Sequence, residues 1–265
     1  MTAPQWIETG RGLHGLVFLH GVSGGALGAS DLLPRITPPG WRGLAWDMPG
    51  YGASAPLEPF DFDGLAQSLA AMLDAAGLDQ AVLVGHSMGG MVALHTAATF
   101  PNRVSGLVLA CCTPAFGAKG GRRQETFLAR RIGPLDEGAS MRELAVELIP
   151  TMVGPGADPQ VVRDAVDQMA AIPPASYRAA MQAVLRFDQR AALGRLSMPA
   201  LVLAGRYDSV SQPVVLRRMA ERIPNARYRE MDAGHLAPFE EPEVFAAAVK
   251  AFLAGLDHAP VTFVL

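Results

Sequence analysis

The sequence predicts an α/β fold: a mostly parallel central sheet of about seven strands in a three-layer sandwich, with an inserted helical lid. One observation is that short apolar runs alternate with longer runs of helical periodicity in the first half of the chain. The other is that this alternation resumes toward the C-terminal end, after a block with a helical pattern throughout. Strands joined by crossover helices pair in parallel, and 265 residues suffice for one such core with a lid.

The predicted strands of the first half are apolar runs bounded by Gly, Pro or Asp, as expected of strands buried on both faces. They comprise residues 16–19, 44–46, 82–84 and 104–109, and two further strands are predicted at residues 200–204 and 227–231. Few residues precede the first of these strands, so we expect just residues 5–8 to pair at that edge of the sheet. This gives a sheet of about seven strands.

Apolar residues at helical spacing predict the helices of the core and of the lid. The core helices cover residues 65–76, 91–99, 214–223 and 242–253, and Gly77 fits a C-terminal stop. Between residues 114 and 193, Gly and Pro pairs separate four helical stretches, at 122–132, 140–149, 160–169 and 177–187. We therefore expect a core made of residues 1–113 and 194–265, with residues 114–193 inserted as a helical cap.

Composition excludes several classes of protein. Hydrophobic residues make up 50% and charged residues 18% of the chain, which excludes intrinsic disorder. A net charge of −3 argues against a nucleic-acid binder, since phosphate neutralisation supplies most of the affinity of such proteins. The pairs Arg122-Arg123 and Arg130-Arg131 are interpreted as solvated helix positions in the lid.

The N-terminal residues lack a signal-peptide pattern, and no stretch approaches 18 apolar residues, so we expect a cytoplasmic protein that does not span a membrane. The adjacent Cys111 and Cys112 give neither a disulfide framework nor metal-ligand spacing. Residues 261–265 are apolar and β-prone; we expect local packing there, with a homo-oligomer contact as the alternative.

The most specific signal is Gly85-His86-Ser87-Met88-Gly89, between a predicted strand and a predicted helix. A serine at the apex of such a turn has strained backbone angles, and side chains two residues to either side would collide with neighbouring backbone. The turn would expose the hydroxyl above the sheet and place the amide of Met88 at a helix N-terminus, where it can bind an oxyanion. We predict that Ser87 is a nucleophile; the alternative is a glycine-rich turn with an incidental serine.

Two further motifs accompany this turn: His20-Gly21 after the first strong strand, and Asp47-Met48-Pro49-Gly50-Tyr51-Gly52-Ala53-Ser54. With them the chain resembles the α/β-hydrolase superfamily over nearly its whole length, nearest its carboxylesterase and 3-oxoadipate enol-lactonase branch. The first motif is similar to the family's oxyanion loop and the second to its D-x-P-G-x-G-x-S turn. The resemblance implies that the amides of Val22 and Met88 form the oxyanion hole.

A serine hydroxyl is a weak nucleophile, so it needs a base and a group that orients the base. The family's order of serine, acid and histidine implies that both follow Ser87. His235 lies on a loop where the family places its base, whereas His258 lies in the tail after the last helix. Asp208 ends a predicted strand, at the carboxyl edge where α/β sheets carry their chemistry. Asp232 is closer to His235 in sequence, but we assign it a local turn role.

The resemblance implies a serine hydrolase that cleaves a carboxylic ester or lactone through an acyl-enzyme. Ser87 would attack the acyl carbonyl, His235 would take and return the proton, and Asp208 would orient the imidazole. This chemistry needs no metal and no organic cofactor, and no zinc-protease, P-loop or dinucleotide motif competes in the sequence.

Apolar side chains along the lid predict a small-molecule apolar ester or lactone as the substrate, with packing of the lid itself as the alternative. Ser23, Cys111 and Phe127 are the candidates for substrate contact. Two other reactions within the family stay open: carbon–carbon bond hydrolysis of ring-cleavage diketones, and cofactor-free haloperoxidase or perhydrolase chemistry. The first group often has Asn at the position of His86 and the second an aromatic residue. Acyl transfer to an alcohol and a non-enzymatic ligand receptor are the remaining alternatives.

Overall fold

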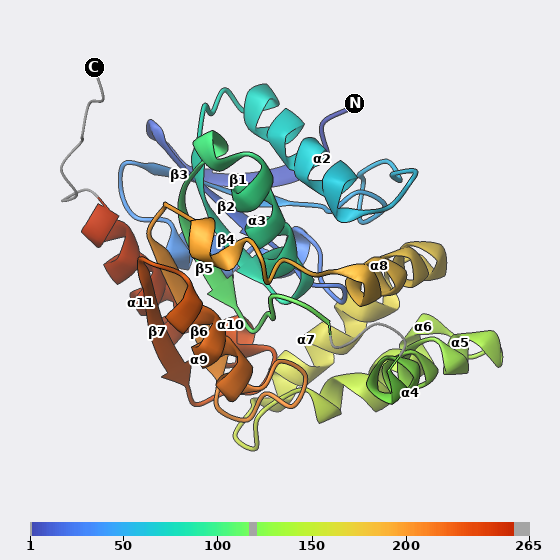
Figure 1. Ribbon diagram of the computed structural model, residues 1–265. Coiled ribbons are helices and arrows are strands. Elements are labelled where there is room, and N and C mark those ends of the chain that lie inside the picture. Colours follow the sequence, from blue (N-terminus) through green and yellow to red (C-terminus); the bar gives the residue numbers. More distant parts are fainter. Residues whose placement is uncertain (1, 117–120, 257–265) are drawn as a thin grey trace.

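The computed structural model, which describes residues 2–116 and 121–256, has one seven-stranded sheet at its centre (Figure 1). The strand order is β1-β3-β2-β4-β5-β6-β7, and each pair is parallel except β1 with β3. The strands are β1 (Trp6–Gly10), β2 (His14–Leu19), β3 (Trp41–Trp46), β4 (Ala81–His86), β5 (Val104–Ala110), β6 (Ala200–Gly205) and β7 (Ala226–Met231). The predicted fold class is confirmed, including the strand that pairs at the N-terminal edge.

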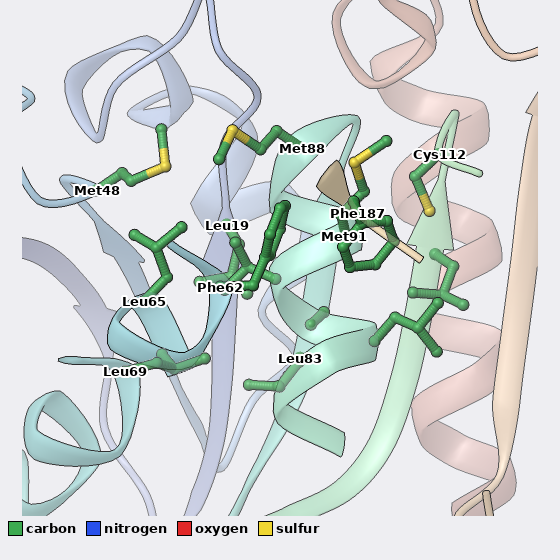
Figure 2. Packing of buried hydrophobic residues seen from close by; sticks show 14 of the residues in the cluster. Leu19, Met48, Phe62, Leu65, Leu69, Leu83, Met88, Met91, Cys112 and Phe187 are labelled. Carbon is green, nitrogen blue, oxygen red and sulfur yellow. The ribbon is translucent and has the colours of Figure 1, made fainter. Parts of the chain in front are cut away.

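Helices cover both faces of the sheet, because successive residues of a buried strand point to opposite sides. Along β4, Leu83 packs into one apolar cluster, while Val82 and Val84 pack into the other. The cluster of Leu83 is filled from α2 (Phe62–Ala75), α3 (Met88–Thr99) and α9 (Pro213–Arg222), and Figure 2 shows part of it around α3. The opposite cluster is filled from α1 (Leu32–Ile36) and α11 (Pro242–Leu256).

The boundaries of α2 and α3 follow from local chemistry. Helix α2 begins before the predicted residue 65, because the Asp61 carboxylate caps it by accepting from the Gly64 amide. It ends before Gly77, whose φ of 68° lies in the left-handed region. Helix α3 begins directly after Ser87 instead of near residue 91, because its first turn contains two glycines that weaken the helical signal.

Between β5 and β6 the described chain is helical, and we call residues 121–193 the helical insertion. Its helices are α4 (Arg122–Arg131), α5 (Gly133–Asp136), α6 (Met141–Leu148), α7 (Pro159–Ala170) and α8 (Pro174–Arg186). In Figure 1, α4 to α7 group together to one side of the sheet. The chain enters and leaves this region at one place, since the Gln189 amide donates to the Pro114 carbonyl and the Phe116 amide to the Phe187 carbonyl.

Three short helices were not predicted. Helices α1, α5 and α10 (Ala237–Glu240) have four or five residues each, too few for a helical period to stand out. For α5, we interpreted Gly133-Pro134 as a separator, whereas Pro134 sits in the first turn, where its missing N–H costs nothing.

Within the described residues, no helix combines the length and apolar character needed to cross a membrane. The predicted behaviour of residues 261–265, and His258 with them, lies outside the described part of the chain.

Candidate active site

Ser87 stands alone between β4 and α3 on a turn with φ 54° and ψ −121°, a left-handed conformation that side chains rarely adopt. The flanking glycines are required by space. A Cβ at Gly85 would overlap the carbonyl oxygen of Gly89, and one at Gly89 would overlap that of Leu19. The Ser87 amide donates to the Ala110 carbonyl of β5 at 2.9 Å, which fixes the turn against the neighbouring strand. The strained turn that the motif predicts is present.

Three predicted residues, distant in sequence, lie in one hydrogen-bonded row. His235 Nε2 is 2.9 Å from Ser87 Oγ, and His235 Nδ1 is 2.8 Å from Asp208 Oδ2. Because an ionised carboxylate only accepts, the Nδ1 proton points to Asp208 and leaves Nε2 to accept from the serine hydroxyl. The side chains of His235 and Asp208 are 3% and 0% exposed, so water does not compete for their contact.

The carboxylate of Asp208 is held by backbone as well as by the imidazole. Its Oδ1 accepts from the amides of Val210 and Ser211, both at 2.8 Å, in the turn that follows β6. These two bonds fix the direction of the other oxygen toward His235. The competing carboxylate, Asp232, is exposed and pairs with Arg206 at 3.0 Å.

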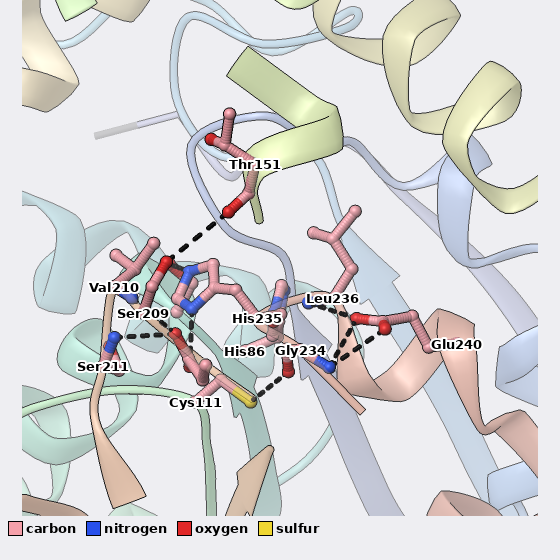
Figure 3. Close-up of polar contacts among 12 residues, drawn as sticks. His86, Cys111, Thr151, Ser209, Val210, Ser211, Gly234, His235, Leu236 and Glu240 are labelled. Atoms are coloured by element: carbon pink, nitrogen blue, oxygen red, sulfur yellow. Dashed lines mark hydrogen bonds and ion pairs between the residues drawn. The ribbon is translucent and has the colours of Figure 1, made fainter. Parts of the chain in front are cut away.

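The loop of His235 is fixed by a residue that sequence reasoning missed. The carboxylate of Glu240 accepts from the amides of Gly154 at 2.7 Å, of Gly234 at 2.9 Å and of Leu236 at 3.1 Å. Figure 3 shows it beside the backbone of this loop. Glu240 ends the four-residue helix α10, which gave no periodic signal; its spacing of five from His235 was the available clue.

The predicted oxyanion loop is tied to the second motif. His20 Nε2 accepts from the Met48 amide at 3.0 Å, and the Tyr51 hydroxyl donates to the Val22 carbonyl at 3.1 Å. A Cβ at Gly21 would lie 3.0 Å from the Cβ of Ser87, so this loop packs directly against the serine. Burial lowers the pKa of His20, which keeps the ring neutral and able to accept.

The serine faces a small cavity of about 40 Å³, which we call the inner cavity. Its described lining includes Val22, Ser87, Met88, Phe127, Arg131 and His235. Sequence reasoning proposed all of these except Arg131 for the site. The prediction that both Arg130 and Arg131 are solvated holds for Arg130 and is wrong for Arg131, which is half-buried because α4 turns it toward the core.

The other two candidates for substrate contact lie elsewhere. Cys111 is fully buried, and its Sγ lies 3.8 Å from the Gly234 carbonyl (Figure 3). Burial raises the pKa of its thiol well above the ordinary value. Ser23 lines a separate cavity of about 220 Å³ with His20 and Gly21. Neither Cys111 nor Ser23 is part of the inner-cavity lining.

The lining that sequence reasoning missed is mainly apolar. Met91, Met181, Val184 and Val210 join Phe127 and Met152, two of the apolar lid side chains expected at a pocket wall, around the inner cavity. These side chains come from α3, from the helical insertion and from the turn after β6. The sequence pattern of a single segment therefore does not identify them as lining residues.

The sequence was compared with known proteins, and the family described as "alpha/beta hydrolase fold" matches residues 16–242. The chain belongs to this alpha/beta hydrolase fold family. The match confirms the resemblance inferred from the three motifs.

Named relatives within the alpha/beta hydrolase fold family include esterases and lactonases. The chain is 30% identical over 240 residues to a pimeloyl-[acyl-carrier protein] methyl ester esterase of Neisseria meningitidis, covering 87% of this chain and 73% of that protein. It is 28% identical over 213 residues to 3-oxoadipate enol-lactonase 2 of Acinetobacter baylyi, covering 79% and 78%. Among solved structures, a thermophilic esterase from Thermogutta terrifontis superposes with a TM-score of 0.81 at 28% identity, covering 95% and 93%.

Residues that could bind a metal ion are scattered in the described part of this alpha/beta hydrolase. In residues 2–116 and 121–256, His, Cys, Asp and Glu side chains do not gather in groups of three that could hold a metal ion. The imidazole, carboxylate and hydroxyl at the site instead contact one another.

Proposed function

We propose that this protein is a serine hydrolase that cleaves a carboxylic ester or lactone through an acyl-enzyme. The observation that carries the proposal is the row of two hydrogen bonds from Ser87 to His235 and from His235 to Asp208. In such a row a base activates the nucleophile, and a buried carboxylate holds the base in the required tautomer. The names of the relatives, a methyl ester esterase and an enol-lactonase, support the same class of bond.

In the first half of the reaction, Ser87 Oγ forms a bond to the acyl carbon as its proton passes to His235 Nε2. The carbonyl π electrons move to the oxygen, and the amides of Val22 and Met88 donate to that oxyanion. When the tetrahedral intermediate collapses, the bond to the leaving oxygen breaks, and that oxygen receives the proton from His235. An alcohol departs from an ester, whereas an opened lactone stays bonded to Ser87 as a hydroxyacyl group and leaves as the acid only after hydrolysis.

In the second half, water attacks the acyl carbon while His235 Nε2 takes a proton from it. Collapse of the second intermediate breaks the bond to Ser87 Oγ, which recovers the proton. Asp208 stabilises the imidazolium formed in each half without becoming protonated itself. The helical insertion would be the main part of the predicted cap of residues 114–193. It would place Phe127 and Met152 over the reacting group.

The test is a panel of aryl esters of graded chain length, with several lactones, assayed on the wild type and on Ser87→Ala. We expect hydrolysis by the wild type and a loss of about 10⁶ in kcat for the variant. A fluorophosphonate should form a bond from phosphorus to Ser87 Oγ with loss of fluoride, which adds the phosphonyl group to the mass of the wild type, and it should leave Ser87→Ala unmodified. Full activity in Ser87→Ala would refute the acyl-enzyme, and cleavage of a vinylogous diketone without any ester would favour carbon–carbon bond hydrolysis.

A further inference from the structure

Two neighbouring cavities share part of their walls. A wide cavity of about 810 Å³, the outer cavity, is lined by helices α4 and α6 and by the turn after β6. Phe116, Phe127, Arg131 and Val210 line both the outer cavity and the inner cavity. A water molecule takes about 30 Å³ of liquid volume, so the inner cavity has room for little more than the reacting group. Any larger substrate therefore extends past these four residues into the outer cavity.

Arg131 differs from the arginines of the protein that form ion pairs. Salt bridges to Asp or Glu are formed by Arg35, Arg42, Arg103, Arg142, Arg178, Arg190, Arg206 and Arg217. Arg131, at the end of α4, forms none with any carboxylate in the described part of the chain. Its guanidinium carbon instead lies 3.9 Å from the centroid of the Phe127 ring.

The position of this guanidinium is costly without an anion. Burial is the main cause that lowers the pKa of Arg131; the neighbouring Tyr177 opposes this shift, and the charge of Arg130 adds to it. Of the described residues that line the inner cavity, Arg131 alone carries a permanent charge. The outer cavity adds Arg130 and one acid, the exposed Glu147, so cations outnumber anions along the substrate path.

The guanidinium carbon of Arg131 lies over the face of the Phe127 ring, and among the described residues no hydrogen bond or ion pair joins its N–H donors. A carboxylate matches that planar donor edge with two parallel hydrogen bonds, which a neutral group cannot do. We propose that Arg131 binds a substrate carboxylate, carried at the end of the molecule away from the ester or lactone bond. This inference rests on the proposed function, since it places the reacting carbonyl at Ser87.

The test compares substrates that differ in one charge. Monomethyl adipate ends in a carboxylate, and methyl adipamate ends in a carboxamide of nearly the same shape; succinate and sebacate homologues vary the reach. A second series carries the carboxylate or carboxamide on the alcohol side of an acetate ester. We expect the wild type to prefer the acid in at least one series by about tenfold or more in kcat/KM, the effect of a charged hydrogen bond.

Three variants assign the preference to Arg131. Arg131→Met should bring the ratio of acid to amide close to one, because it lowers the acid rate more than the amide rate. Arg131→Lys keeps the charge without the fork and should retain part of the preference. The control is Arg163→Met on α7, an exposed arginine that lines neither cavity, which should behave as the wild type. Circular dichroism confirms that each variant is folded.

Binding separates this inference from the proposed function. Calorimetry with Ser87→Ala should find adipamic acid bound about tenfold more tightly than adipamide, and the difference should vanish when Arg131→Met is added. That result supports the carboxylate site even if no ester is hydrolysed, in which case the proposed function fails alone. Equal rates and equal affinities for acid and amide, with esters hydrolysed through Ser87, would overturn the carboxylate site and leave the proposed function standing.

Discussion

The ring of His86 donates to the backbone carbonyl of His235, with Nε2 and the oxygen 2.7 Å apart. A carbonyl oxygen only accepts, so His86 must carry its proton on Nε2. The bond links the turn that holds Ser87 to the loop that holds His235, two segments 149 residues apart. It therefore couples the position of Ser87 to that of His235, and it depends on a neutral, fully buried imidazole.

This buried imidazole predicts an acid-sensitive fold. Burial, aided by the charge of His235, lowers the pKa of His86 from 6.5 to about 3. Between these values the unfolded chain binds a proton that the folded chain does not, so stability falls as the pH falls below 6.5. His86 should contribute about 1.4 kcal/mol of lost stability per pH unit in that window and nothing above it. Urea unfolding at pH 7, 6 and 5 measures this.

The matched variant is His86→Gln, whose amide can donate to the same carbonyl and does not titrate. Its free energy of unfolding should decline with acid less steeply than that of the wild type, by about that amount per unit. Parallel declines in the two proteins would show that His86 is not the group responsible.

The acid of the row can be tested by an isosteric change. In Asp208→Asn an amide replaces the carboxylate that faces His235 Nδ1, so the imidazole favours the wrong tautomer. We expect kcat for an aryl ester to fall by about 10⁴ with little change in KM. Asp232→Asn alters the competing, exposed carboxylate and should keep nearly full activity. The reverse pattern would transfer the role to Asp232.

Glu240 is expected to stabilise the loop of the base. Removing its carboxylate in Glu240→Ala leaves three backbone donors without their charged acceptor, and the protein should lose roughly 3 kcal/mol or more of stability. The kcat should also fall, since the loop sets the direction of His235. The control is Glu241→Ala, because the side chain of Glu241 makes no hydrogen bond within the described residues. Thermal unfolding and kcat, measured on both variants, decide whether Glu240 matters more than its neighbour.

The glycines of the nucleophile turn should tolerate no side chain. Gly85→Ala and Gly89→Ala would each press a Cβ into a backbone oxygen, and we expect a loss of about 2 kcal/mol or more, or no folded protein. Gly156→Ala is the control, since a Cβ there meets no described heavy atom within 4 Å and its φ is not left-handed. It should be neutral or slightly stabilising by urea unfolding. Stable, active Gly89→Ala protein would contradict the packing at this turn.

The sequence predicted those site residues whose positions follow from neighbouring residues or from the order of strands and helices. Ser87 could be recognised because its turn needs glycines at fixed spacing, and the strain at its φ of 54° is a local property. Asp208 and His235 could be found because they follow β6 and β7, and the carboxyl ends of parallel strands meet at one edge. The motif around Asp47 was recognised, but its bonds to the loop of Val22 were not.

The positions of Arg131 and Glu240 in the site could not be predicted from such patterns. Arg131 belongs to a pair of arginines on a helix, a pattern typical of solvated positions, and only the packing of α4 turns one of the two inward. Glu240 lies in a helix of four residues. The amides that donate to its carboxylate come from both the helical insertion and the loop of His235. Neither contact follows from a helical or strand period, and the spacing of five between His235 and Glu240 was the only local clue among the described residues.

The sequence by itself determined the parallel sheet, the order of its elements and the strained serine turn, because each follows from neighbours along the chain. Only the tertiary structure decided which side chains of the helical insertion face Ser87, how small the inner cavity is and which arginine of the pair Arg130-Arg131 turns inward. Those features arise where separate segments pack together, and packing depends on the shapes of side chains that the linear pattern does not bring into contact.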